Sequence, residues 1–358
     1  RGVAVVDPHD LAEQILEYIP PERAEDVIFF DPADMERPMG MNIMDARTED
    51  ERHFVTGMVI NLMYKLYDPH KTGIIGPRFE HAIRNAMLTV MEAVPGGTFM
   101  EVVRVLTDSR YVQELLPRVK DPVVRRYWTD QIAQTSDFHK SEVLDYIVSK
   151  FGQFITNKMM RNIICQSKSA FDLRKVMDEN KILIVRLNKG VLGEQNANFL
   201  GLILVPRILM AALSRTDVPE EKRPDFYLYV DEFQNFATPD FVTIMAEARK
   251  YHLNLVVANQ FVNQLDAEIK SAIFGNVGTK IVLRVGIEDA PFLAQEFRGV
   301  FNEEDLINVD RFNAYVSTMV NNAPVPPFSM DTTKDLEQDA RERSAEVGAM
   351  VAELSKLK

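Results

Sequence analysis

Two adjacent carboxylates, Asp231 and Glu232, directly follow the apolar run from Tyr227 to Val230 in the stretch DFYLYVDEFQNF. A run without polar alternation is typical of a strand buried on both faces of a parallel sheet. Acids that follow such a strand lie in the crevice where open α/β sheets bind ligands. In a nucleoside triphosphatase the first acid would hold Mg²⁺ through water, and the second would orient or deprotonate the attacking water. The alternative is a buried strand that ends in two solvated acids.

Three further residues have the types that a phosphate-cleaving site uses. Gln260 follows a strand predicted at 255–258, where it is either a sensor of the γ-phosphate or an ordinary loop amide. Arg249 ends the intervening helix and either pairs with surface acids or reaches a neighbouring subunit as an arginine finger. Arg284, inside a strand predicted at 280–285, has the same two alternatives, an ion pair with a neighbouring acid or an arginine finger.

Asp7 and His9 lie at the end of the strand predicted at 3–6, and so near the same crevice. Both are candidates for contact with a nucleotide, and His9 is equally suited to ordering its own loop. The six histidines have no paired ligand spacing, there is no cysteine pair, and no GxSxG elbow occurs. The sequence therefore gives no support to a structural metal site or an acyl-transfer enzyme.

A phosphate-binding loop of the form GxxxxGK[ST] is absent from these 358 residues. The nearest match, Lys71-Thr72-Gly73, has the right residue types in the wrong order and lies in a helical region. We therefore expect no ATP hydrolysis by this chain alone. Because residues 3–6 form a strand with no loop before it, we expect part of the core to lie upstream.

The composition is that of an ordinary globular protein, with 46% hydrophobic and 26% charged residues. The net charge of -12 disfavours a free-standing nucleic-acid binder but leaves room for local basic loops. A single cysteine, Cys165, excludes an internal disulfide and favours the cytoplasm. No apolar run approaches the roughly 20 residues of a membrane span, so we expect any anchor to lie outside this chain.

Strands alternate with helices on both sides of a long helical stretch, which predicts an α/β fold with a mainly parallel sheet. We predict a first part of the core at 1–50, an all-α inserted domain at 51–165, and a second part of the core at 166–323. The last segment, 324–358, is expected to be a proline-rich linker and a helix. The strands are predicted at 3–6, 27–30, 181–187, 227–230, 255–258 and 280–285.

The segments VVDPH, DFYLYVDEFQNFATPDF, EARKYHLNLVVANQ and FGNVGTKIVLRVGIEDAPFLAQEF resemble the TraG/TraD-type coupling ATPases of conjugation and type IV secretion, within the HerA/FtsK group of RecA-like motors. The resemblance extends from Val3 to about Thr332 and implies a RecA-like P-loop NTPase core with an all-α insertion. It implies that Asp231 and Glu232 are the Walker B pair, with Asp231 on Mg²⁺. It also implies that Gln260 is the sensor glutamine and Arg249 the arginine finger.

The same resemblance implies ATP and Mg²⁺ as cofactors and a homo-hexameric ring that pumps DNA through its channel. Partners would be the conjugation or type IV secretion machinery. The motor would lie in the cytoplasm at the inner face of the cell membrane, tied to it by an N-terminal region outside this chain. In that family the Walker A loop precedes the strand matched by 3–6. The sequence departs from the family in two places, since no glycine separates His9 from Asp10 and these residues contain no Walker A loop.

The resulting hypothesis is the motor portion of an ATP-driven DNA translocase that serves as a coupling protein. Two alternatives remain open at this point. One is a non-catalytic subunit that keeps the fold and recruits partners through the helical insertion. The other is a secretion ATPase that moves protein instead of DNA.

Overall fold

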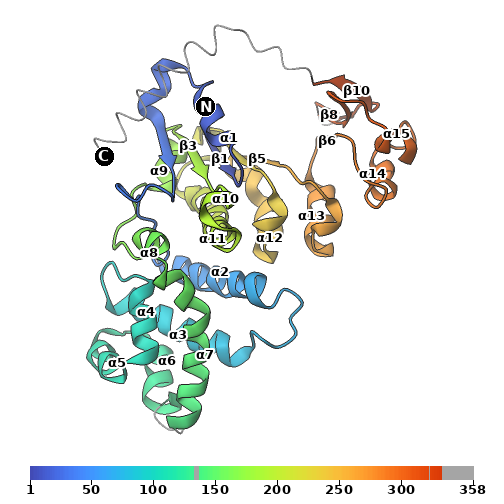
Figure 1. Ribbon diagram of the computed structural model, residues 1–358. Coiled ribbons are helices and arrows are strands. Elements are labelled where there is room, and N and C mark those ends of the chain that lie inside the picture. The colour runs from blue at the N-terminus through green and yellow to red at the C-terminus, as the bar shows by residue number, and fades with distance from the viewer. Residues whose placement is uncertain (133–136, 322, 333–358) are drawn as a thin grey trace.

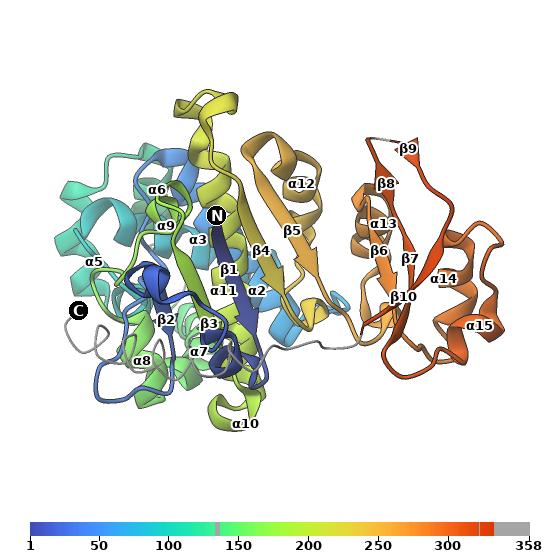
Figure 2. The ribbon, with the colours of Figure 1, turned by 90° about the horizontal axis from the view of Figure 1, so that it is seen from above.

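The computed structural model describes residues 1–132, 137–321 and 323–332. At its centre is a parallel sheet of five strands in the order β2-β3-β1-β4-β5 (Figure 2). Five of the six predicted strands form this sheet, which confirms the α/β architecture. Its strands are β1 (Gly2–Asp7), β2 (Val27–Phe30), β3 (Ile182–Arg186), β4 (Phe226–Val230) and β5 (Leu253–Val257).

The two faces of this sheet are covered differently. One face packs on α9 (Leu173–Asp178), α11 (Glu194–Leu213) and α12 (Pro239–Ala248), and its inward side chains belong to the main core. On the other face α1 (Leu11–Leu16) covers β1 and β3.

Over β4 and β5 this second face is open, and we therefore correct the prediction of a strand buried on both faces. Tyr229 is 41% exposed and Val256 is 43% exposed. Only alternate residues of β4, namely Phe226, Leu228 and Val230, enter the core. The reason is that no helix of the described residues covers β4 on the side of Tyr229.

An all-helical region interrupts the core between β2 and β3 (Figure 1). Within the described residues from 49 to 164 there is no strand, as the sequence predicts for the insertion. Its helices are α2 (Glu49–Tyr67), α3 (Pro77–Ala93), α4 (Phe99–Thr107), α5 (Ser109–Leu115), α6 (Pro122–Arg126), α7 (Asp137–Thr156) and α8 (Lys158–Ile164), with a π-helical turn at Tyr127–Ile132.

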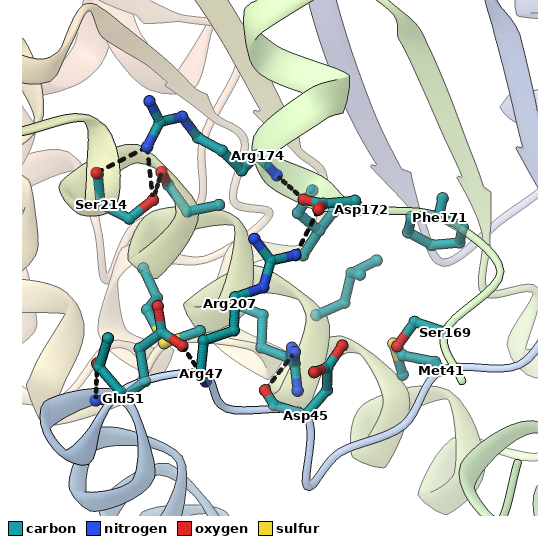
Figure 3. Close-up of a pocket in the computed structure, with 15 residues that line it drawn as sticks. Met41, Asp45, Arg47, Glu51, Ser169, Phe171, Asp172, Arg174, Arg207 and Ser214 are labelled. Atoms are coloured by element: carbon teal, nitrogen blue, oxygen red, sulfur yellow. Dashed lines mark hydrogen bonds and ion pairs between the residues drawn. The ribbon is translucent and has the colours of Figure 1, made fainter. Parts of the chain in front are cut away.

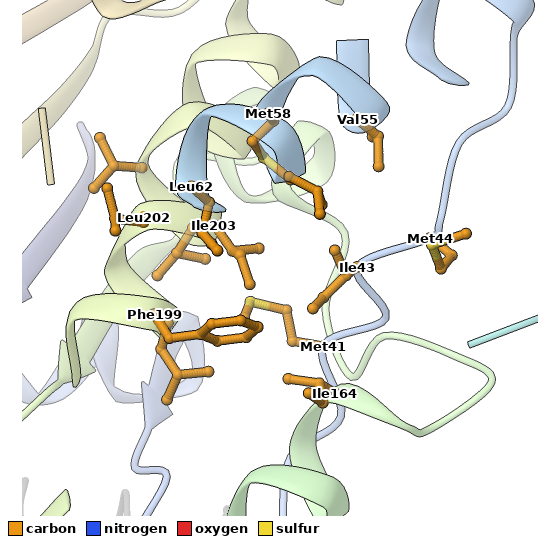
Figure 4. Packing of buried hydrophobic residues seen from close by; sticks show 14 of the residues in the cluster. Met41, Ile43, Met44, Val55, Met58, Leu62, Ile164, Phe199, Leu202 and Ile203 are labelled. Atoms are coloured by element: carbon orange, nitrogen blue, oxygen red, sulfur yellow. The ribbon is translucent and has the colours of Figure 1, made fainter. Parts of the chain in front are cut away.

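The helical region joins the core through one continuous apolar contact. Met58 and Leu62 of α2 meet Phe199 and Ile203 of α11, and Met41 of the entering chain fills the space beside them (Figure 4). All five side chains are buried. Burial of apolar side chains of this size typically contributes about 1.5–3 kcal/mol each, so the two regions share a core.

The strand predicted at 280–285 does not extend the parallel sheet. Only its first three residues form a strand, β6 (Lys280–Val282), which pairs antiparallel with β7 (Asn313–Ser317). Strand β7 also pairs with β10 (Phe328–Asp331). This second sheet has its own small core, centred on Phe297. The segment therefore belongs to a separate C-terminal unit (Figure 2).

The C-terminal unit also takes up part of the predicted linker. Pro324 ends one short strand and Phe328–Asp331 form another, whereas the predicted last helix lies outside the described residues. The remaining α-helices and strands of the described residues are α10 (Lys189–Leu192), α13 (Ala267–Asn276), α14 (Ala290–Glu296), α15 (Glu303–Ile307), β8 (Met319–Val320) and β9 (Ala323–Pro324).

Helix α11 corrects a second expectation. Together with the turn that follows it, Glu194–Asp217 is long and apolar enough to cross a membrane, contrary to the sequence-based prediction. However, 78% of its most apolar window is buried inside the protein. Its apolar character is explained by its place between the sheet and the helical region.

Gly201 of α11 sets how closely this helix approaches the turn after β4. A Cβ atom built at Gly201 would lie 2.2 Å from Cε1 of Phe236, so the ring occupies the space of a side chain. Gly57 of α2 is the matched contrast, because a Cβ there meets nothing within 4 Å.

We predict opposite effects for the same substitution at these two glycines. Gly201→Ala should lower the free energy of unfolding by about 2 kcal/mol, since overpacking costs roughly 1–3 kcal/mol. Gly57→Ala should raise it by about 0.5–1 kcal/mol through helix propensity. Chemical denaturation of both variants measures the two values. A Gly201→Ala protein as stable as the parent would contradict the close packing of Phe236 on α11.

Candidate active site

The parallel pairing brings two acidic strand ends together at the carboxyl edge of the sheet. Val6 of β1 pairs with Val230 of β4, and the amide of Asp231 donates to the Val6 carbonyl over 3.1 Å. Asp7 and the pair Asp231-Glu232 therefore end neighbouring strands. This is the position in open α/β sheets where ligands bind.

Asp7 is buried and has a structural task at this edge. Its Oδ1 accepts a hydrogen bond from the His9 amide over 2.9 Å, and its Oδ2 accepts one from the Ala12 amide over 2.7 Å. It thereby holds the first turn of α1. Asp10 stands at the N-cap position of α1, but its side chain accepts a hydrogen bond from the Asn188 amide and makes no cap contact.

Glu232 has a left-handed backbone, with φ 48 and ψ 45. This conformation is uncommon for a residue with a side chain and costs about 1–3 kcal/mol. It begins a short 3-10 turn, Phe233–Asn235, in which Phe233 is fully buried. Such strain at a sheet edge is typical of functional turns.

His9 and Glu232 approach each other across the two strand ends. His9 Nε2 lies 3.6 Å from Glu232 Oε1, which is an ion pair when the imidazole is protonated. The His9 side chain is 55% exposed, whereas that of Glu232 is 17% exposed. His9 is therefore beside the predicted catalytic carboxylate and open to an incoming molecule.

Asp231 is partly buried and surrounded by negative charge. Its Oδ1 accepts a hydrogen bond from the Glu232 amide over 2.9 Å. Burial is the largest cause that raises the pKa of Asp231, and the charges of Glu232 and Asp7 add to it, against the hydrogen bond from the Glu232 amide. A carboxylate in this setting favours a bound cation or a proton.

A divalent cation fits this carboxylate in the way Mg²⁺ is usually held. Mg²⁺ commonly takes one or two carboxylates and fills its remaining positions with water and substrate phosphate. Among the described residues no group of three or more His, Cys, Asp or Glu side chains forms a closed metal site. Asp231 would therefore be the protein ligand, with the rest of the coordination supplied by water and nucleotide.

The structure brings some of the predicted residues together and separates others. Gln260 lies on the same edge beyond β5 and is exposed, and no hydrogen bond in the described part of the chain joins it to Asp231 or Glu232. Arg249 lies at the opposite edge of the sheet, because it precedes β5. The backbone carbonyl of its neighbour Lys250 accepts a hydrogen bond from Arg223, which precedes β4 at the same edge. Arg284 lies beyond β6 in the C-terminal unit.

The Lys71-Thr72-Gly73 loop, the nearest match to a phosphate loop, is occupied by the protein's own carboxylate. The side chain of Asp68 accepts hydrogen bonds from the Thr72, Gly73 and Ile75 amides at 2.6–3.1 Å. Burial raises the pKa of Asp68, but these hydrogen bonds outweigh it and lower the pKa to about 2. With its amides already bound to an acid, this loop does not provide a phosphate site.

The segment that carries most of the predicted site matches a known family. Residues 225–296 match the family described as the TraM recognition site of TraD and TraG. The predicted resemblance to TraG/TraD-type coupling ATPases is confirmed. Asp231, Glu232, Arg249 and Gln260 all lie inside this segment. A search of curated proteins found no match to the chain.

The fold is similar to that of solved coupling proteins. Plasmid coupling protein TrwB with the ATP analogue ADPNP matches with a TM-score of 0.67 at 15% identity, over 95% of this chain and 80% of that one. VirB4 of Thermoanaerobacter pseudethanolicus matches with a TM-score of 0.62 at 13% identity, over 94% and 83%. TrwB has also been solved with ADP and Mg²⁺. These likenesses confirm the predicted RecA-like fold.

Two residues at the carboxyl edge were not predicted. Gln234 donates a hydrogen bond to Glu232 Oε2 through its side-chain amide, a contact that depends on the left-handed turn and has no sequence signal. The second is Arg186 at the end of β3, whose guanidinium nitrogen lies 3.2 Å from a carboxylate oxygen of Glu13 and 3.2 Å from one of Asp31. Arg186 could have been predicted to form an ion pair from its place in an apolar strand, because a charge in such a strand needs an oppositely charged partner.

A cavity of about 250 Å³ lies away from this edge, where the chains that enter and leave the helical region pass α11 (Figure 3). Buried Arg207 donates to the carbonyls of Asn42, Ile43 and Asp45 at 2.9–3.0 Å. Arg47 pairs with Asp172 over 2.5 Å. The acidic and basic side chains that line the cavity offset each other in charge. The cavity therefore has the features of a contact between the core and the helical region, and not those of an anion-binding site.

We predict that Asp231→Asn stabilises the fold at neutral and alkaline pH. The raised pKa means that the folded protein binds this proton more tightly than the unfolded chain, so ionised Asp231 lowers stability above the folded-state pKa. The variant should gain about 1 kcal/mol at pH 8, a usual gain when a functional charge is removed. The gain should shrink as pH falls through that pKa.

Thermal unfolding between pH 4 and pH 8 measures this difference. Exposed Asp310→Asn is the matched control and should be neutral across the range. A gain for Asp231→Asn that is equal or larger at pH 4 would show that the carboxylate is not destabilised by its surroundings.

Proposed function

We propose that this chain is the motor portion of a conjugative coupling ATPase that moves DNA. The observation that carries the proposal is the position of Asp231 and Glu232. They end a central parallel strand, beside the end of β1, and lie within the segment that matches the TraD and TraG family. A sheet edge with adjacent carboxylates is where a RecA-like motor binds and cleaves its nucleotide.

The roles follow from the geometry of this edge. Asp231 would hold Mg²⁺, which when bound neutralises phosphate charge, and Glu232 would orient and deprotonate the attacking water. His9 lies beside Glu232 and is accessible to nucleotide, whereas Asp7 supports the loop that carries it. Exposed Gln260 would contact the γ-phosphate only when nucleotide is bound. The phosphate loop would come from a segment upstream of these residues.

Assembly and location form the further part of the proposal. Arg249, at the opposite edge from Asp231, would act on the site of an adjacent subunit in a homo-hexameric ring. DNA would pass through the channel, with the ring at the inner face of the cell membrane beside the conjugation machinery. Arg284 is the second candidate for the trans contact.

The role of Glu232 is tested in a protein that also carries the upstream segment. Glu232→Gln should lower the rate of ATP hydrolysis by at least about 10² and leave ATP affinity unchanged, since it removes a base and keeps the size. Exposed Glu114→Gln is the matched control. Turnover within about tenfold of the parent would mean that Glu232 is not the base.

The same comparison distinguishes the alternatives. The 358-residue chain alone should not hydrolyse ATP, since it has no phosphate loop. An in-frame GKS or GKT loop in the upstream coding sequence indicates a motor, and its absence indicates a non-catalytic subunit. Stimulation of turnover by DNA separates a DNA motor from an ATPase that moves protein.

The trans role of Arg249 is tested by mixing two inactive proteins. Arg249→Ala and Glu232→Gln proteins, both with the upstream segment, should regain activity when mixed, because some interfaces then pair an intact Glu232 with an intact Arg249. Arg110→Ala, at an exposed site in the helical region, should be active alone. Full activity of Arg249→Ala by itself would end this assignment and make Arg284 the next residue to test.

A further inference from the structure

Both carboxylate oxygens of Glu232 have a neighbour at the sheet edge. Oε2 accepts a hydrogen bond from Nε2 of Gln234, and Oε1 lies 3.6 Å from His9 Nε2. Gln234 is only 8% exposed, whereas His9 is largely in solvent. One oxygen is therefore bound on the protein side, and the other lies toward the open crevice.

The Gln234 side chain is carried by a turn that is anchored on both sides. Phe233 and Phe236 are fully buried, and the Phe233 amide donates to the Ala258 carbonyl over 3.0 Å. The ring of Phe236 packs against Gly201 of α11. With aromatic anchors before and after it, Gln234 has little freedom to move, so its amide is a fixed donor for Glu232.

This turn and the segments beside it, after β5 and before α12, contain buried polar atoms that have no partner in the described part of the chain. They include the second amide atom of Gln234, its oxygen Oε1, together with atoms of Asn235, Thr238 and Asn259. A buried polar atom without a partner costs about 1–3 kcal/mol. An apolar residue at 234 would avoid this cost, so fold stability does not account for the glutamine, whereas its contact with Glu232 does.

We propose that Gln234 is a positioning residue that holds the Glu232 carboxylate, binding Oε2 so that Oε1 is presented on the His9 side. Its catalytic consequence rests on the proposed ATPase function. A base that is held in one orientation reacts more often than one that samples several rotamers, because misplacement by about 1 Å can cost 10²-fold in rate. Gln234 itself touches neither water nor nucleotide in this role.

The contact is tested first by stability, without nucleotide. A double-mutant cycle in the 358-residue chain uses Gln234→Met, Glu232→Ala and the double variant, each followed by chemical denaturation. We expect the unfolding equilibrium constant of the double variant to differ at least threefold from the product of the single effects. The control pair, Gln234→Met with Glu114→Ala on the exposed surface of the helical region, should be multiplicative. Gln234→Asn, one methylene shorter, serves if Gln234→Met does not fold.

The consequence is tested by kinetics in the protein with the upstream segment. Gln234→Met should lower kcat at least tenfold and change the KM for ATP less than twofold, and it should add nothing in a Glu232→Gln background. A purely structural role would lower the melting temperature and leave kcat of the folded protein intact.

Each outcome decides between the two ideas. Multiplicative effects in the stability cycle overturn the role of Gln234, even if Glu232→Gln abolishes hydrolysis and so supports the ATPase. Coupling in the cycle with an unchanged kcat also overturns it. A parent protein that has the coupling but never hydrolyses ATP removes the proposed function, and the positioning role with it. Coupling together with a loss in kcat supports both.

Discussion

The central parallel pairing of β1 with its two neighbours is the constraint on which the site depends. The Asp231 amide bonds to the Val6 carbonyl, and the Leu187 amide bonds to the Asp7 carbonyl, so three strands end in register. Parallel strands need long crossovers, and the chain makes one of them through an entire helical region inserted between β2 and β3. Residues more than 200 positions apart in the sequence, Asp7 and Asp231, thus come to one edge.

Helix α11 links this edge to the rest of the molecule. Near its beginning, Gly201 receives the ring of Phe236 from the turn that carries Glu232 and Gln234. Farther along, Arg207 binds three carbonyls of the chain that enters the helical region. The helix is apolar on nearly all sides because it is enclosed by the sheet and the helical region, which explains how a core helix has the composition of a membrane span.

Several features of the carboxyl edge of the sheet lower the stability of the fold. It combines a glutamate with a left-handed backbone, a carboxylate with a raised pKa, and several buried polar atoms that have no hydrogen-bond partner among the described residues. Each costs free energy, and the surrounding aromatic anchors and parallel pairing offset that cost. Concentration of strain and charge at one sheet edge is typical of sites where function, and not folding, selected the residues.

The sequence by itself determined the strands of the central sheet, the helical insertion and the family resemblance, because apolar runs, helical periodicity and motif residues are local properties. It also placed Asp7, His9, Asp231 and Glu232 at strand ends, and parallel pairing then brings such ends together. Only the tertiary structure placed 280–282 in a separate antiparallel sheet, because the sequence pattern of a strand does not indicate which strand it pairs with. The same limit applied to Arg249, whose position at the opposite edge depends on the direction of α12. The Gln234–Glu232 hydrogen bond depends on the left-handed backbone of Glu232. This conformation is set by the packing of the turn and cannot be predicted from the residue type.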